Sequence, residues 1–149
     1  MYVPEYFTFK ELIKSETAEA RRIDNTPSWE YIENLNSLCE HILDPLRKAW
    51  GHPIKINSAF RCQQLNNAIK GASPTSVHRF GNAADLWPIG YGNKFDEFVS
   101  FTIKFLETNH IMFDQLLIES NSQGQKWLHI GEYSTTGLQR KQVKTMTVL

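Results

Sequence analysis

The chain has 149 residues, 41% of them hydrophobic and 21% charged, with 16 basic side chains against 16 acidic ones, which describes one ordinary folded domain. Zero net charge provides no overall field that attracts polyanions, so neither a nucleic acid partner nor stable membrane association is expected. Cys39 and Cys62 form neither a disulfide framework nor a CxxC pair, so any metal must use other ligands.

The first part of the chain is predicted to be helical. Thr8 and Glu11 fit a capping box, in which each side chain accepts a backbone N–H of the other residue, and a short helix to about Lys14 follows. A longer amphipathic helix is expected next, because apolar side chains recur at three- and four-residue steps. These side chains are Ile32, Leu35, Leu38, Cys39, Ile42, Leu43 and Leu46. Pro45 has no N–H to donate, so we expect this helix to kink or restart near Leu43.

The middle of the chain alternates between strands and helices. Ile54–Asn57 alternates apolar and polar residues, as a strand does, and Gln63–Lys70 is typical of a short helix. Ala83–Trp87 is predicted to be a buried strand. Asn93 is a suitable N-cap for a further helix that carries apolar residues on one face. These residues are Phe95, Phe98, Val99, Thr102, Phe105 and Leu106.

The last part of the chain is predicted to form a hairpin and a tail. Two apolar runs, Gln115–Ile118 and Trp127–Ile130, are separated by the turn-rich segment Ser120–Gly124. The polar tail from about Gly131 ends in Met146–Leu149, which is either an edge strand or a loose end. The whole chain therefore predicts one α+β domain, with a small antiparallel sheet, helices packed on one side and a peripheral tail.

Two histidines and one aspartate are candidates for a metal site. His78 lies in a predicted loop, seven residues before Asp85 in a buried strand. A buried carboxylate is costly unless a cation or hydrogen-bond donors compensate it. His129 lies in a similar setting, between apolar neighbours on a predicted core strand. Two imidazoles and one carboxylate from separate elements are a typical three-ligand zinc set that leaves a fourth position for water.

Each of these residues also has an ordinary structural interpretation. A single histidine in a strand is more often a packed, hydrogen-bonded core residue, and a buried aspartate more often pairs with arginine or caps a turn. A Ser-His-Asp hydrolase based on Ser76, His78 and Asp85 is disfavoured. A serine and a histidine two residues apart on one loop do not readily give the geometry of a nucleophile and its base.

The combined pattern resembles a known family. Ser76–Asp85 fits SxHxxGxAxD, Trp127–His129 fits WxH, and Ile56–Arg61 ends in SxxR. This pattern resembles the zinc D-alanyl-D-alanine carboxypeptidase and phage L-alanyl-D-glutamate endopeptidase family, whose fold is shared with the hedgehog signalling domain. Phe9–Leu12 and Leu43–Arg47 resemble the phage-associated branch of that family. The resemblance covers most of the chain and implies a hedgehog/D,D-peptidase-like fold.

The resemblance also implies roles for individual residues. His78, Asp85 and His129 would bind zinc, which would activate a water molecule for hydrolysis. Arg61 would face the substrate and hold a carboxylate or the developing oxyanion, a role that suits a guanidinium. Its alternative is a surface arginine or one paired with an aspartate. Ser76 would orient its loop or His78 rather than act as a nucleophile.

A general base must take a proton from that water, and the motifs do not directly identify the residue that does so. In better-known relatives an acidic residue lies a few residues before the last histidine, but here no carboxylate lies between Ser120 and His129. The nearest candidates are Glu119 and Glu132. Glu119 shares the face of His129 if it pairs with Trp127, and loses it if the register shifts by one residue. We take Glu119 as the base, its alternative being an exposed turn carboxylate.

The resemblance implies a zinc-dependent peptidase that cuts the stem peptides of bacterial peptidoglycan, as a D,D-carboxypeptidase or as an endolysin-type endopeptidase. We expect a monomer that is synthesised in the cytoplasm without a signal peptide. It would act on the cell wall after a phage-type release by a separate membrane-permeabilising protein. The alternative is a catalytically inactive, zinc-containing module that binds wall peptides or is structural. The absence of a carboxylate just before His129 favours that alternative.

Overall fold

Helices dominate the start of the chain and form largely where local signals predict them. The computed structural model describes residues 1–148. A reciprocal capping box between Thr8 and Glu11 starts α1 (Phe9–Ile13), as expected. α2 (Glu16–Arg21) has no counterpart among the predicted elements, because its six residues show too little apolar periodicity.

A π-helical turn interrupts the long amphipathic helix at the predicted position. α3 (Trp29–Leu38) continues into the turn η1 (Cys39–Leu43), and α4 (Asp44–Trp50) begins directly after it. Pro45 lies in the first turn of α4 and has no N–H to continue the hydrogen-bond ladder from η1. The wider π turn absorbs the break in the hydrogen-bond ladder that proline imposes. The expected restart near Leu43 is therefore confirmed.

Five strands form one sheet in the order β1-β2-β4-β3-β5. They are β1 (Ile54–Ser58), β2 (Ala83–Pro88), β3 (Gln115–Asn121), β4 (Lys126–Gly131) and β5 (Gln142–Val148). β1, β2, β4 and β3 pair antiparallel, including the predicted β3–β4 hairpin, whereas β5 pairs parallel to β3. β4 ends beside Gln115 at the start of β3, and β5 begins at that same end, so it runs in the direction of β3.

The predicted α+β class is thus confirmed, with a sheet that is mostly rather than wholly antiparallel. Of the two alternatives for the end of the chain, the edge strand is the one observed. Leu149, the last residue of that predicted segment, lies outside the described residues.

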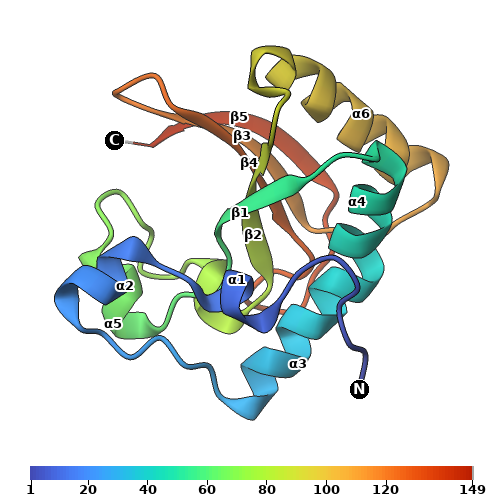
Figure 1. The fold of residues 1–149 in the computed structure, drawn as a ribbon. Helices are drawn as coiled ribbons and strands as arrows, with labels where there is room; N and C mark the ends of the chain where they lie inside the picture. Colours follow the sequence, from blue (N-terminus) through green and yellow to red (C-terminus); the bar gives the residue numbers. More distant parts are fainter. Residues whose placement is uncertain (149) are drawn as a thin grey trace.

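The alternation of side chains gives the sheet one apolar face, which the main helices cover. Ala84 and Leu86 on β2, with Leu128 and Ile130 on β4, are completely buried in the core. α4 and α6 (Phe95–Thr108) lie against this face (Figure 1). Burying one leucine or isoleucine side chain contributes roughly 1.5–3 kcal/mol. This layer therefore fixes the strands that carry the polar residues of the opposite face.

The start of α6 differs from the prediction. Asn93 does not cap the helix, because it lies inside a 3-10 turn, η3 (Gly92–Lys94). In that turn the N–H of Phe95 donates to the carbonyl of Gly92, so the backbone already satisfies an N–H that an Asn93 side-chain cap would accept. The expected apolar face of the helix is confirmed. Its buried residues are Phe95, Phe98, Val99, Thr102 and Leu106.

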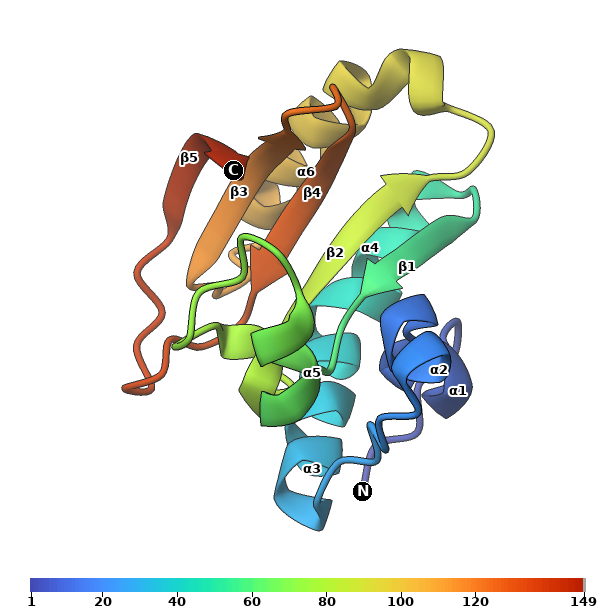
Figure 2. The same ribbon diagram turned by 90° about the vertical axis from the view of Figure 1, so that its left-hand side faces the viewer.

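The opposite face of the sheet is polar at its centre, and Figure 2 looks onto it with α4 and α6 behind the strands. α2 and α5 (Gln63–Ala68) lie at one end of this face, on the side away from α6 (Figure 1). α5 ends two residues earlier than predicted, since Ile69 already has an extended backbone. Among residues 1–148, no helix combines the length and apolar character that crossing a membrane requires.

Candidate metal centre

Asp85 and His129 are direct cross-strand partners near the middle of the sheet. β2 and β4 pair in a register that places Asp85 opposite His129. Because the strand neighbours of both residues face the apolar core, the two side chains share the polar face. Oδ1 of Asp85 lies 3.0 Å from Nδ1 of His129. The strand pairing alone therefore brings two of the predicted metal ligands together.

His78 reaches the same point from a different element. It lies in the 3-10 turn η2 (Val77–Phe80), which ends at Gly81 with a φ of 74°. A Cβ atom at Gly81 would lie 2.7 Å from the backbone oxygen of Tyr31 in α3. Only glycine fits both this positive φ and this close approach. Gly81 thus seats the turn against α3 and directs His78 toward the sheet.

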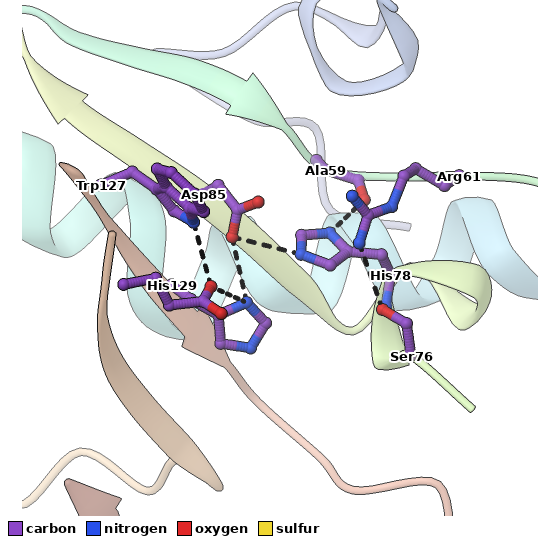
Figure 3. Close-up of polar contacts among 8 residues, drawn as sticks. Ala59, Arg61, Ser76, His78, Asp85, Trp127 and His129 are labelled. Carbon is purple, nitrogen blue, oxygen red and sulfur yellow. Dashed lines mark hydrogen bonds and ion pairs between the residues drawn. The ribbon is translucent and has the colours of Figure 1, made fainter. Parts of the chain in front are cut away.

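The hydrogen bonds of His78 define its tautomer. Nδ1 lies 2.7 Å from the carbonyl oxygen of Ala59, which can only accept, so Nδ1 carries the hydrogen. Nε2 lies 3.2 Å from Oδ1 of Asp85 (Figure 3). With Nδ1 donating, Nε2 keeps its lone pair, as a metal ligand requires.

The three side chains form one compact group that fits a metal ion. His78, Asp85 and His129 are 2%, 7% and 6% exposed, so the group is shielded from water. One ligand atom from each lies within 4.8 Å of the other two. Tetrahedral zinc with bonds near 2.1 Å separates its ligands by roughly 3.4 Å, which small side-chain rotations supply. The donor set of two imidazole nitrogens and a carboxylate oxygen is one that zinc commonly takes.

Asp85 has no cationic side chain of its own within residues 1–148. Its ion-pair partners are the imidazoles of His78 and His129, and no lysine or arginine lies within 4.0 Å of its carboxylate. The alternative of a structural aspartate–arginine pair is therefore wrong. A buried carboxylate with two imidazoles is the arrangement in which a bound cation contributes most.

The protonation states also suit a metal. Burial would raise the pKa of the Asp85 carboxyl, but the neighbouring imidazoles of His78 and His129 outweigh it and hold that pKa well below its usual range. Burial lowers the pKa of His78, against the opposing attraction of Asp85. Asp85 is therefore an anion and His78 is neutral at neutral pH, the forms in which both bind metals.

Arg61 and Ser76 lie beside His78 (Figure 3). Nη2 of Arg61 donates to Oγ of Ser76 at 3.3 Å, and the same oxygen accepts the backbone N–H of His78. Ser76 thus orients the turn, and both imidazole nitrogens of His78 face other groups, which disfavours a Ser-His-Asp triad. Nε of Arg61 is buried and has no hydrogen-bond partner in the described part of the chain, residues 1–148. Burial lowers the pKa of Arg61, but the guanidinium stays charged and able to take an anionic group.

Glu119 lies on the polar face beside His129. It pairs with Trp127, which is the register that the general-base assignment requires. Its Oε1 lies 3.7 Å from Nδ1 of His129 and accepts the indole N–H of Trp127 at 3.0 Å. Burial raises the pKa of Glu119 above its ordinary value. The hydrogen bond from Trp127 was not anticipated, although the register that places Glu119 also places Trp127 next to it.

Glu132, the other candidate base, lies away from this group. It is buried on the helical side, where it accepts the hydroxyl of Ser37 at 2.7 Å and contacts Nδ1 of His41 at 2.8 Å. β4 ends at Gly131, and one further step along the chain turns the side chain to the other face of the sheet. Glu132 therefore links the end of β4 to α3 and η1. Of the two candidate bases, Glu119 is the one beside His78, Asp85 and His129.

A cleft of about 1030 Å³ runs along the polar face next to this group. Lys55 and Asn57 of β1, Trp87 of β2 and Trp127 of β4 line it, together with Arg61. Two of these residues contact the site directly, since Arg61 bonds Ser76 and Trp127 bonds Glu119. A large ligand in the cleft would therefore lie against the residues around the candidate metal position.

A buried His-Asp-His group beside an acidic residue and a wide cleft defines a candidate metallohydrolase. A family model described as Peptidase M15 matches residues 5–123. The chain belongs to this peptidase family, which is the family that its motifs resemble. The matched segment contains His78, Asp85 and Glu119 and ends before His129. A comparison with curated proteins found no match.

Proposed function

We propose that this protein is a zinc-dependent peptidase that hydrolyses peptide bonds in the stem peptides of bacterial peptidoglycan. The observation that carries the proposal is the buried group of His78, Asp85 and His129, with Glu119 and Arg61 beside it. Membership of the M15 peptidase family supports the reaction class. The substrate rests on the motifs that resemble wall-cutting members of that family.

Each residue has a distinct part in this reaction. His78, Asp85 and His129 would hold the zinc ion, which supplies Lewis-acid polarisation of the scissile carbonyl and of a water molecule. Glu119 takes a proton from that water and delivers it to the leaving amine. Its raised pKa suits a group that must both accept and release a proton near neutral pH. The guanidinium of Arg61 holds a substrate carboxylate or the developing oxyanion.

The cleft supports a peptide substrate longer than two residues. Its volume of about 1030 Å³ lies in the upper range of small-molecule sites, and it extends along β1 and β2 beyond the metal group. Five basic side chains line it against three acidic ones, together with two tryptophans, which suits a peptide that carries carboxylates. We further propose that the protein acts on the cell wall, which it reaches by phage-type release. The active form would be a monomer.

A binding module without catalysis is less well supported. The feature that favours it is the lack of a carboxylate in the residues just before His129. Glu119 supplies that carboxylate from the neighbouring strand, 3.7 Å from His129. A zinc-containing module with no hydrolytic role would not need an acid at this position.

Replacement of the ligands tests the proposal. His78→Ala and Asp85→Ala are each expected to abolish zinc binding, measured by metal analysis, and digestion of purified peptidoglycan. His110→Ala serves as the control, because His110 is exposed and lies outside the group. If either ligand variant still digests peptidoglycan, the proposal is wrong. Mass spectrometry of the products separates release of a terminal D-alanine from cleavage within the stem peptide.

A further inference from the structure

Trp127 connects the cleft to the acidic residue of the site. Trp127 and Glu119 are opposed residues on β4 and β3, so their side chains share the polar face. The indole Nε1 of Trp127 donates to Oε1 of Glu119 at 3.0 Å. The ring of Trp127 is half-buried and also lines the cleft. One side chain therefore touches both the expected substrate space and Glu119.

This hydrogen bond leaves the two carboxylate oxygens of Glu119 in different situations. Oε1 accepts the indole N–H, whereas Oε2 accepts no hydrogen bond from any side chain or backbone group within residues 1–148. A glutamate has three side-chain torsions, and a single fixed donor restricts the orientations of its carboxylate. With Oε1 held, Oε2 is the oxygen that remains to accept the proton of a water molecule.

We propose that Trp127 is a positioning residue for Glu119: its indole N–H orients the carboxylate so that Oε2 serves as the general base. This role rests on the proposed peptidase function. The aromatic ring and the N–H have separable effects, since the ring packs against substrate in the cleft while the N–H acts on Glu119. Loss of the N–H alone should slow the chemical step and leave substrate binding intact.

The chain offers a matched comparison in Trp87. It lines the same cleft from β2, but its ring stacks on Phe95 with centroids 5.3 Å apart, and its N–H donates to no group within residues 1–148. Gly92 lies directly against this ring, since a Cβ there would come within 2.5 Å of it. Trp87 is thus a wall of the cleft without a link to Glu119.

The experiment compares Trp127→Phe with Trp87→Phe in the zinc-loaded protein, using peptidoglycan fragments and measuring kcat and KM separately. We expect Trp127→Phe to lower kcat by roughly 10- to 100-fold, with a rise in KM no larger than that of Trp87→Phe, because misplacing a general base costs this much. Trp87→Phe should instead raise KM and preserve kcat. Zinc content should match the wild type in both variants, and a lower melting temperature is expected for Trp87→Phe, whose ring stacks on Phe95.

A second substitution guards against a packing defect in Trp127→Phe. A benzothienylalanine at position 127 keeps the shape of the indole and replaces its N–H by sulfur, so it should lower kcat to the same extent. Full kcat in this variant, or a loss that affects only KM, would overturn the positioning role while the peptidase function stands. A wild-type protein that binds zinc but cuts no wall peptide would overturn the proposed function and the role together.

Discussion

Two buried aspartates in this protein are compensated in opposite ways. Asp114, just before β3, is 2% exposed and accepts hydrogen bonds from Nε and Nη2 of Arg140 at 2.8 and 2.9 Å. Asp85 on β2 is 7% exposed, and its ion-pair partners within residues 1–148 are the imidazoles of His78 and His129. The cation that compensates Asp114 is a side chain of the same protein, Arg140. Asp85 and its two histidines are instead arranged to bind a cation from solution. Burial of an acid alone therefore does not identify a functional site.

The surroundings of the two aspartates show what each one does. Arg140 also donates its backbone N–H to Asp114, and the N–H of Gln142 donates to the carbonyl of Asp114. These bonds attach the segment that leads into β5 to the start of β3. Asp85 instead contacts His129 on the adjacent strand and His78 on η2, and both of these are candidate metal ligands. Asp114 therefore forms a structural ion pair with Arg140, and Asp85 belongs to the candidate metal centre.

Metal removal is expected to give the largest difference in stability between variants of Asp85 and variants of Asp114. If zinc is present at 100 times its dissociation constant, binding stabilises the fold by about 2.7 kcal/mol, so chelation should lower the melting temperature by roughly 5–10 °C for a domain of this size. Asp114→Asn should keep this response to chelator and zinc. Asp85→Asn should lose it.

Calorimetric melts with zinc and with chelator check this difference. The assignment of Asp85 as a ligand fails if Asp85→Asn still gains stability from zinc as the wild type does. An equal loss of the zinc response in both variants would mean that Asp114 also supports the metal group. Peptidoglycan digestion should follow the same order, with activity retained in Asp114→Asn only.

The next effect is on stability without metal. Asp114→Asn removes hydrogen bonds between charged partners and should lower the free energy of unfolding by about 1–2 kcal/mol. Arg140→Ala should lower it further, because the buried carboxylate of Asp114 then has no cation. Replacing both should cost less than the sum of the two, since no buried charge is left unpaired. Urea unfolding of the three variants measures these differences, and strict additivity would contradict the pairing.

The sequence predicts the candidate site better than it predicts the parts around it. His78, Asp85 and His129 follow from the motif and from strand alternation, because a strand that buries Ala84 and Leu128 must turn their neighbours to the other face. The start of α1 follows from a capping box that involves only four consecutive residues. Both predictions depend on short-range rules.

Features that depend on tertiary packing were not predictable in the same way. The pairing of Asp114 with Arg140 joins residues 26 positions apart, and nothing local to either residue indicates it. The register that pairs Glu119 with Trp127 follows from the turn and from burial across several strands. The parallel direction of β5 likewise depends on where the chain after β4 crosses the sheet. These are properties of the assembled sheet.

The smallest expected effect is a pH dependence that separates Asp114 from its asparagine variant. Burial would raise the pKa of Asp114, but the hydrogen bonds and charge of Arg140 outweigh it, so the folded-state pKa lies below its ordinary value of 3.8. A carboxyl whose pKa is lower in the folded state contributes stability above the unfolded-state pKa and loses it as the pH falls through the folded-state pKa.

The difference in unfolding free energy between wild type and Asp114→Asn should therefore be constant above about pH 5 and shrink below pH 3.8. Urea unfolding of both proteins with chelator present removes the contribution of zinc, and a difference that grows with acidification would show that Arg140 does not lower this pKa.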